Sequence, residues 1–422
     1  MTERNRQAPP GPRRWHEQRW LLDTTIRAEG IDWDQPRSFQ TIRPIGAEAA
    51  GEVNLLRGRV RKYDDIAPVF EAASGRHERL AREAEGRGHF VTAREEYFAA
   101  ALLLTVPAWV VTEDDAWLRR IYDRMNANYA GWMKYAPHRV ERVEIPFRGG
   151  KFPAYFHFPR GYQGGRVPTV LHIGGMDTRK EVVVAQHGER LLERGFALFV
   201  VDGPGRGESP LLGAYVTEDN WIETGEILMR YLLGRPEVDP ERIVALGQSF
   251  GSYWVTQVAA TQPGLKGCAA VLCCHEPGCY TIFEQACPSF KHRFMWMANL
   301  HDEAEFDRMA AKMDLRPLIG KLKMPWLNVI GENDELSPIR NTFELAAKCG
   351  GPAPIVVYQG ERHALSGSST STVLGPRHAN LVADWLWDRV NGRPAEEYLE
   401  YVQTDGRVER RPHPRTVMGD GR

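Results

Sequence analysis

The sequence has no long hydrophobic run, no strong charge imbalance and few cysteines. Its apolar stretches fall short of the roughly 18 residues that cross a bilayer, and its first 20 residues lack the apolar segment of a signal peptide. The formal net charge is −1, so no overall field attracts the chain to nucleic acid or to an anionic membrane. We therefore expect a cytoplasmic protein that acts on a small molecule, with no nucleic-acid or membrane partner.

The cysteines do not have the regular spacing of a disulfide framework, and we expect free thiols. Cys273, Cys274 and His275 resemble the start of a metal site. However, neighbouring side chains at a strand end point to opposite faces, and no second Cys/His pair follows at zinc-site distance. The sequence therefore predicts no metal.

The composition is that of a folded globular protein. With 422 residues, 42% hydrophobic and 26% charged, the chain can form a large core in one large domain with an accessory part, or in two domains. Residues 1–50 are rich in Arg and Pro and predict a tail with short helices. Residues 51–137 have helical periodicity, with Gly86 and Gly88 between two helices. This segment is either a helical accessory or a lid.

From residue 138 to 395 the pattern predicts an α/β domain. Two alternating stretches flank Gly149 and Gly150 and predict an antiparallel hairpin. Apolar strands then alternate with helices, which is typical of a mostly parallel, doubly wound sheet covered on both faces. Residues 276–320 interrupt this alternation with helical, aromatic-rich sequence and predict a cap insertion. Residues 396–422 are expected to form a C-terminal tail.

The central stretch of this domain is a strand, a sharp turn and a helix around Ser249. The turn reads Gly247-Gln248-Ser249-Phe250-Gly251 and fits G-x-S-x-G, in which a strained corner exposes the serine hydroxyl. Ser249 is therefore the candidate nucleophile. The backbone N–H of Phe250, at the start of the helix, is a candidate donor to an oxyanion.

A serine nucleophile needs a base and an orienting carboxylate, and later strand ends supply both. Asp334 follows one apolar strand and His363 follows the next, so the chain order is Ser, Asp, His. Glu332 and Glu335 are alternative acids near Asp334.

Two further groups of residues complete the predicted site. A glycine pair after an earlier strand makes Gly175 or Met176 the expected second oxyanion donor. His275, Glu276 and Glu284 follow the strand after the nucleophile helix, and we expect one of them, Glu276 first, to contact the leaving half of a substrate.

The chain resembles the α/β-hydrolases over about residues 140 to 392. The resemblance is carried by the nucleophile turn, by H-I-G-G at 172–175, by D-G-P-G-R-G-E-S at 202–209, by the turn at Asp334 and by His363. The helical sequence at 84–101 is similar to a branch that includes FrsA-like esterases, dihydroxypseudooxynicotine hydrolase and fungal polyketide chain-shortening hydrolases.

This resemblance implies a cofactor-free serine hydrolase with a helical cap, often a homodimer. It implies cleavage of a carbon–carbon bond next to a ketone in an aromatic or polyketide-like substrate. A carboxylesterase or thioesterase acting on small acyl esters is an alternative. An aminopeptidase-like acyl-peptide hydrolase is another, although those usually carry a β-rich segment before the hydrolase domain. A binding protein on an inactive hydrolase fold is disfavoured, because all three triad positions are intact.

Overall fold

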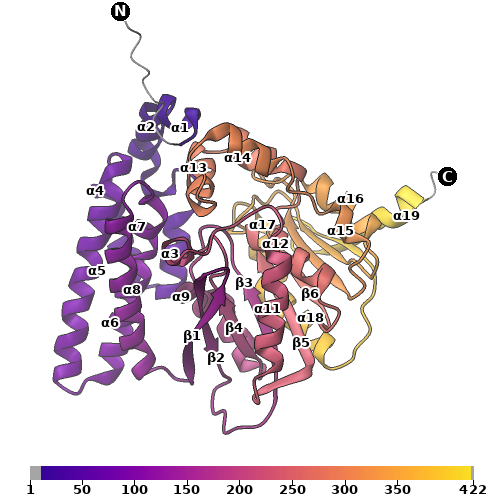
Figure 1. Ribbon diagram of the computed structural model, residues 1–422, viewed down its shortest axis with the longest axis horizontal. Coiled ribbons are helices and arrows are strands. Elements are labelled where there is room, and N and C mark those ends of the chain that lie inside the picture. The colour runs from indigo at the N-terminus through magenta and orange to yellow at the C-terminus, as the bar shows by residue number, and fades with distance from the viewer. Residues whose placement is uncertain (1–10, 420–422) are drawn as a thin grey trace, which may run out of the picture.

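The computed structural model describes residues 11–419. Its helical part begins well before residue 51. The helices in this part are α1 (Arg13–Glu17), α2 (Arg19–Glu29), η1 (Gly30–Asp32), α3 (Arg37–Ile45), α4 (Ala49–Arg59), α5 (Tyr63–Gly86), α6 (Phe90–Leu103), α7 (Thr105–Val110) and α8 (Asp115–Lys134). Figure 1 shows α4 to α8 as a layer beside the sheet, with α3 between that layer and the sheet. The break between α5 and α6 falls at the predicted glycines.

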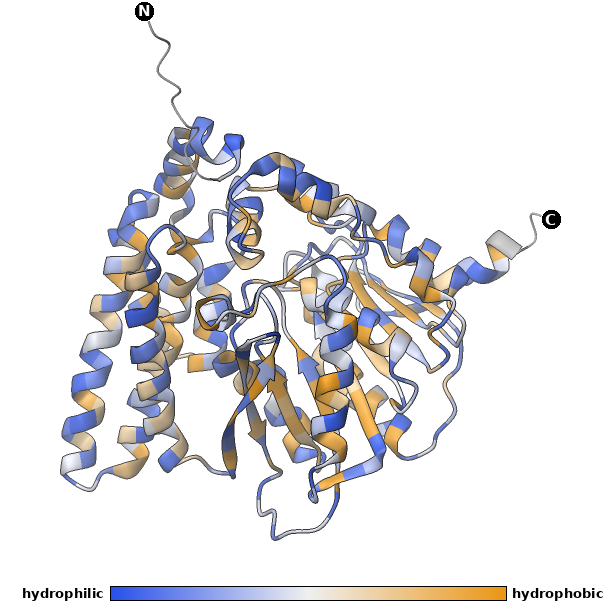
Figure 2. Ribbon diagram, in the orientation of Figure 1, coloured by the Kyte–Doolittle hydropathy of each residue, from blue (hydrophilic) through white to orange (hydrophobic). Residues whose placement is uncertain are grey.

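One sheet of ten strands organises the rest of the chain, in the order β1-β2-β4-β3-β5-β6-β7-β8-β9-β10. The strands are β1 (Val140–Phe147), β2 (Gly150–His157), β3 (Val167–Ile173), β4 (Ala197–Val201), β5 (Val238–Gln248), β6 (Cys268–Val271), β7 (Trp326–Gly331), β8 (Ile355–Tyr358), β9 (Leu399–Val402) and β10 (Val408–Arg411). β1 and β2 form the predicted antiparallel hairpin. From β4 to β9 all neighbours are parallel. The central strands are almost wholly buried and apolar, as expected for a sheet covered on both faces (Figure 2).

Helices cover both faces of this sheet. Those on its flanks and edges are α9 (Lys180–Val183), η2 (Val184–Gly188), α10 (Glu189–Glu193), η3 (Ser209–Leu212), α11 (Trp221–Leu233), α12 (Phe250–Thr261), α16 (Ile339–Lys348), α17 (Thr370–Leu374), α18 (His378–Val390) and α19 (Pro414–Gly419). On one face α11 packs against α12, and on the other α10 packs against α18. The doubly wound α/β fold predicted from the alternation is confirmed.

The insertion between β6 and β7 is helical. It contains η4 (Pro277–Cys279), η5 (Thr281–Gln285), α13 (Pro288–Met297), α14 (Glu303–Ala310) and α15 (Arg316–Ile319). Figure 1 shows α13 and α14 above the carboxyl ends of the strands and next to α1 and α2. The Arg14 guanidinium donates to the carbonyl oxygens of Glu284 and Ala286, and Trp15 stacks on His292 at 4.4 Å between ring centroids. The insertion and the first helices therefore form one continuous cover.

The prediction that residues 396–422 form a tail is wrong. β9 pairs in parallel with β8 and β10 pairs with β9, so this segment completes the sheet. Leu399 and Val402 of β9 are buried, so this strand contributes to the core of the domain. Sequence analysis missed β9 and β10 because each strand is too short to show a clear periodicity.

For residues 1–50 the sequence predicted a tail with short helices, and α1, α2 and α3 occupy most of residues 13–45. The first ten residues of that predicted tail lie outside the described residues. Among the helices from residue 11 to 419, none is long and apolar enough to cross a membrane.

Candidate active site

The corner at Ser249 is built by two glycines. β5 ends at Gln248, Ser249 takes φ 55° and ψ −129°, and α12 begins at the next residue. A Cβ on Gly247 would lie 2.2 Å from the carbonyl oxygen of Gly251, and one on Gly251 would lie 2.1 Å from that of Ile173. Only glycine at positions 247 and 251 lets the helix start so close to the strands. The resulting sharp turn places the Ser249 side chain at its corner.

Ser249, His363 and Asp334 form a chain of hydrogen bonds. Ser249 Oγ lies 2.8 Å from His363 Nε2, and His363 Nδ1 lies 2.8 Å from Asp334 Oδ2. The His363 and Asp334 side chains are 4% and 2% exposed. The other carboxylate oxygen of Asp334 accepts the backbone N–H groups of Leu336 and Ser337, both at 2.9 Å. The carboxylate is therefore fixed, and it holds the imidazole with Nε2 toward the serine.

The charge of Asp334 also sets the protonation of His363. Burial by itself would lower the pKa of His363, but the negative charge and the hydrogen bond of Asp334 outweigh it, and the pKa lies above its ordinary value. Glu335 and Asp177 contribute in the same direction. The site therefore favours the imidazolium that forms when a histidine takes a proton from serine.

The alternative acids contact the backbone instead of the imidazole ring. Glu332 accepts the N–H of Gly360 at 3.0 Å, and Glu335 accepts the N–H of His363 at 2.9 Å. Both carboxylates shape the histidine loop. Asp334 alone of the three reaches His363 Nδ1 in the structure.

The loop after β3 comes next to the serine. A Cβ on Gly175 would lie 2.9 Å from Ser249 Cβ, and Met176 is buried at the cavity wall. Arg206 Nε donates to the carbonyl oxygen of Gly175 at 3.1 Å. In a trans peptide the C=O and the following N–H point in opposite directions, so the N–H of Met176 points away from Arg206.

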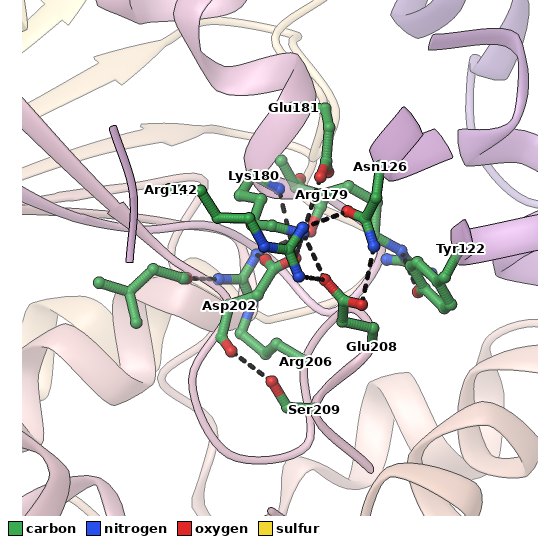
Figure 3. Close-up of polar contacts among 12 residues, drawn as sticks. Tyr122, Asn126, Arg142, Arg179, Lys180, Glu181, Asp202, Arg206, Glu208 and Ser209 are labelled. Carbon is green, nitrogen blue, oxygen red and sulfur yellow. Dashed lines mark hydrogen bonds and ion pairs between the residues drawn. The ribbon is translucent and has the colours of Figure 1, made fainter. Parts of the chain in front are cut away.

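Buried arginines hold this loop in place (Figure 3). Besides Gly175, Arg206 donates to the carbonyl oxygen of Thr178 at 2.7 Å and to that of Val201. Arg179 donates to the Tyr122 hydroxyl at 2.8 Å and to the carbonyl oxygen of Ala108 at 2.9 Å. The loop is thus tied both to the sheet and to the helical layer.

An ion cluster whose centre, Lys180 and Glu181, is fully buried lies next to the same loop (Figure 3). Lys180 Nζ lies 2.7 Å from Glu181 Oε1 and 3.0 Å from Glu208 Oε1. Burial would lower the pKa of Lys180, but the charges of Glu181 and Glu208 more than offset this and raise it. Glu208 also accepts from Asn126 of α8 at 2.9 Å and pairs with Arg142 of β1 at 3.1 Å. The cluster joins the helical layer, the hairpin and the loop after β3.

A cavity opens onto Ser249 and His363, and part of its wall comes from residues 1–50, which were predicted to form a tail with short helices. Gln35, Arg37 and Arg43 line it, on or just before α3. The ends of α3 were readable, with Pro36 before it and Gly46 after it. Its position over the nucleophile depends on contacts far away in sequence, which no local pattern contains.

Two contacts connect α3 and the residues before it to the catalytic loops. Arg37 binds both oxygens of Asp34 at 2.7 Å and Asp177 Oδ2 at 3.1 Å. Gln35 Nε2 donates to Glu335 Oε1 at 3.1 Å. The first reaches the loop after β3, and the second reaches the loop that carries the acid.

His275, Glu276 and Glu284, the predicted substrate-contacting residues, are not among the residues that line this cavity in the described chain. His275 is buried and its Nδ1 lies 3.1 Å from the Thr342 hydroxyl. Glu276 accepts the N–H of Thr281 at 2.6 Å, which caps η5. Glu284 pairs with Lys291 at 2.6 Å. Ile282 and Phe290 are the insertion residues that reach the cavity.

No group of His, Cys, Asp and Glu suited to a metal ion occurs within residues 11–419. All six cysteines are present as free thiols, five of them buried. Burial raises the pKa of the Cys273 and Cys274 thiols well above the ordinary value. These thiols are therefore protonated and apolar in character.

Comparison of the sequence with curated proteins identifies fungal relatives. The alpha/beta hydrolase pydG of Acremonium sp is 24% identical over 249 residues, 55% of this chain and 58% of the relative. The 20-hydroxy-prefusarin hydrolase FUS2 of Gibberella moniliformis is 27% identical over 249 residues, with the same two shares of 55% and 58%. The chain thus spans little more than half the length of the curated relatives it matches.

Solved structures share the fold at low identity. The crystal structure of 2,6-dihydroxy-pseudo-oxynicotine hydrolase has a TM-score of 0.64 at 21% identity and covers 89% of this chain and 95% of its own. Wild-type AbyA5 has a TM-score of 0.59 at 17% identity, covering 88% of this chain and 99% of its own. These likenesses confirm the α/β-hydrolase fold.

The family comparison covers about two thirds of the chain, from within α5 to α16, including the turn at Ser249. The sequence profile described as Esterase FrsA-like matches residues 72–346. The chain therefore belongs to the FrsA-like esterase family of α/β-hydrolase enzymes.

Proposed function

We propose that this hydrolase uses Ser249 as nucleophile, His363 as base and Asp334 as orienting acid. We further propose that it cleaves a carbon–carbon bond next to a ketone in an aromatic or polyketide-like substrate. The observation that carries the triad is the pair of 2.8 Å contacts that joins the three side chains. A serine on a strained strand-to-helix corner, aligned with a buried His–Asp pair, has the geometry of acyl transfer.

In the first half of the reaction, His363 Nε2 takes the hydroxyl proton as Ser249 Oγ attacks the substrate carbonyl. The tetrahedral oxyanion accepts the N–H groups of Phe250 and Met176. Met176 is preferred to Gly175 as the second donor, because Arg206 holds the carbonyl of the shared peptide on the other side. Asp334 stabilises the imidazolium meanwhile.

In the second half, the imidazolium of His363 gives its proton to the leaving group, and the carbon–carbon or carbon–oxygen bond breaks to leave an acyl-enzyme. Water then attacks the acyl carbon with His363 again as base, and Ser249 is released with its proton. A carbon leaving group must be a stabilised carbanion, such as an enolate or an electron-rich phenol ring.

The cavity walls support an aromatic or polyketide-like substrate. Apolar side chains from four parts of the chain line it, namely Val106, Val182, Ile282, Phe290 and Leu336. Its polar lining includes a group around Arg43, with Gln186, His187 and His378, which we call the polar end. Polar groups placed in a largely apolar wall are usual for a small-molecule site. The carbon–carbon specificity rests on the family resemblance stated above.

Ester hydrolysis is the second candidate, and the esterase description of the matching family favours it. It requires the same triad and no carbanion. An acyl-peptide hydrolase is less well supported, because the segment before the hydrolase domain is helical from Arg13 to Lys134.

Turnover of a matched pair of substrates tests the proposal. The pair is an aryl β-diketone, whose leaving group is an enolate, and nitrophenyl acetate, whose leaving group needs no proton. We expect measurable ketone cleavage, and we expect Ser249→Ala to abolish cleavage of both while Ser366→Ala, three residues from His363, keeps it. Rapid ester turnover with no ketone cleavage would make the enzyme a carboxylesterase. Unchanged turnover in Ser249→Ala would refute the triad.

The homodimer and the cytoplasmic location remain predictions. Light scattering of the purified chain measures the first, and fractionation of the source cells measures the second. A monomer at all concentrations would remove the dimer from the proposal.

A further inference from the structure

We propose that the polar end of the catalytic cavity is a binding subsite for an anionic oxygen group of the substrate, a carboxylate or an ionised enol or phenol, with Arg43 as its cation. This rests on the proposed function, because Ser249 and Arg43 line the same cavity. The subsite extends the proposed function by requiring that the substrate carry a negative charge.

The charges around the cavity are unevenly placed. Arg37, Arg43 and Asp177 are the Arg, Lys, Asp and Glu side chains that line it within the described chain. Arg37 pairs with two carboxylates, Asp34 at 2.7 Å and Asp177 at 3.1 Å. Both aspartates therefore contact Arg37, and Arg43 has no carboxylate beside it in the part of the chain that the structure describes.

Arg43 has only neutral partners. Its Nη2 donates to the carbonyl oxygen of Gln186 at 3.4 Å, and its guanidinium lies 5.9 Å from the Phe39 ring centroid. No carboxylate among residues 11–419 comes within ion-pair distance of it. A partly buried cation without a counter-ion carries an uncompensated desolvation cost, which an incoming anion removes.

The other groups around Arg43 are cationic or neutral as well. Arg190 lies close enough for its charge, after burial, to lower the pKa of Arg43. Burial, with Arg43 and Arg190 adding to it, lowers the pKa of His378 to about 4. Burial, His172 and Arg43 lower that of His187 well below its ordinary value. Both imidazoles are thus neutral at neutral pH, and each can donate one N–H to an oxygen.

Local backbone structure brings these groups to the cavity. Gln186 and His187 belong to η2, a π-helical turn, which displaces their side chains relative to a regular helix. The side-chain oxygen of Gln186 has no hydrogen-bond partner among the described residues, so the amide can rotate to offer its N–H groups. Arg43, Gln186, His187 and His378 together provide one charged and three neutral donors at one end.

This end adjoins the nucleophile. His187, Gln248 and His378 line a recess that continues the cavity, and Gln248 immediately precedes Ser249. A substrate with its carbonyl at Ser249 can therefore place an anionic oxygen at Arg43. The bidentate fork of a guanidinium suits a carboxylate, and a single phenolate oxygen also fits it.

Calorimetry of the Ser249→Ala protein tests this subsite without turnover. The probes are phenylacetate against its uncharged isostere phenylacetamide, and 4-nitrophenolate against 4-nitroanisole. We expect each anion to bind roughly ten- to a hundredfold more tightly than its neutral partner, which is the range for a charge-assisted hydrogen bond. Preference in the first pair alone assigns a carboxylate, and preference in the second alone assigns an ionised phenol or enol.

Three second substitutions in the Ser249→Ala background localise the effect. Arg43→Gln should remove the preference for the anion, and Arg43→Lys should keep part of it. Arg190→Gln is the matched control, because Arg190 is a neighbouring cation that donates to the same Gln186 carbonyl but does not line the cavity. It should keep the preference.

Equal affinity of the Ser249→Ala protein for anion and neutral partner would overturn the proposal, as would no binding of either. So would a preference that survives Arg43→Gln. Failure of the proposed function would appear in the turnover assay, as esterase activity that persists in Ser249→Ala. That result would leave the calorimetric comparison of anion and neutral partner unchanged.

Discussion

Ser249 takes a backbone conformation that an ordinary serine avoids, with φ at 55°. The surrounding contacts impose it, since β5 and α12 meet there and both flanking glycines are in close contact. Strain of this kind persists only where the neighbourhood enforces it. The G-x-S-x-G pattern is predictable from sequence for this reason, because the steric requirement is local.

The role of Asp334 gives the first prediction at this scale. Asp334→Asn should lower kcat roughly ten-thousandfold, because an amide favours the wrong tautomer of His363. Steady-state kinetics measure this, with Glu332→Gln and Glu335→Gln as controls that keep the ring contact intact. A larger loss in either glutamine variant would show that the acid has been misassigned.

The pH dependence of the reaction follows from His363. Its pKa lies above the ordinary 6.5, because Asp334 outweighs the effect of burial. Since the base must be neutral, kcat/KM on a neutral ester should rise with pH and have its inflexion above 6.5. In Asp334→Asn the residual activity should show a lower inflexion. An inflexion below 6.5 in the unsubstituted enzyme would contradict this account.

The same shift affects stability with a definite sign. Because the folded-state pKa is raised, the protonated histidine stabilises the fold. This contribution is complete below 6.5 and is lost as pH rises through the folded-state value. The His363–Asp334 pair should therefore stabilise the free enzyme less at the higher pH values where kcat/KM is greatest.

Arg206 is a positioning residue in this account, because it acts through the peptide between Gly175 and Met176. A lysine cannot span the carbonyls that the guanidinium binds. Arg206→Lys should therefore lower kcat roughly a hundredfold with little change in KM. Arg142→Lys, at the partly exposed edge of the same network, is the control. Equal kcat values for the two variants would show that Arg206 has no positioning role.

At the scale of elements, α3 shows what sequence reasoning could not reach. The sheet was readable from sequence as far as β8, because each buried parallel strand up to that point is a short apolar run between helices, whereas β9 and β10 were missed. The position of α3 at the cavity was not readable, since Arg37 reaches Asp177 across 140 residues. Glu276 was predicted to contact substrate because it follows a strand of the sheet, but the structure shows its carboxylate bound to the backbone N–H of Thr281 at the start of η5.

The ion pairs of Arg37 predict a large effect on stability. The Arg37 side chain is 6% exposed and that of Asp34 is 0% exposed, so removal of the cation leaves buried carboxylates unpaired. Arg37→Leu should cost about 3–5 kcal/mol in the free energy of unfolding. Urea denaturation measures this, and Arg27→Leu on the exposed face of α2 should stay within about 0.5 kcal/mol of the parent. Similar values for both variants would mean that α3 is not held by this cluster.

At the scale of the whole molecule, the cover over the site comes from two separate parts of the chain, residues 13–134 and 277–319. Their contacts through Arg14 and Trp15 make them one structure (Figure 1). Helical composition predicted residues 51–137 and the insertion at 276–320. Their union depends on a few long-range contacts, which composition does not contain.

The last strands also matter beyond their own edge of the sheet. Gln359 donates its N–H to the carbonyl oxygen of Val402 at 3.0 Å, just before the loop that carries His363. A chain that ends at residue 395 should lose this support and expose β8 as an edge. We expect a lower melting temperature and loss of turnover, measured by calorimetry and ester hydrolysis. Unchanged values of both would show that residues 396–422 are dispensable.

The central claim is that Ser249 is the nucleophile that His363 and Asp334 activate, and active-site labelling tests it most directly. The protein is treated with a fluorophosphonate, and intact mass and peptide mapping locate the adduct. The account predicts one adduct, on Ser249, and none on a folded Ser249→Ala protein. An adduct on another residue, or continued labelling of Ser249→Ala, would contradict it.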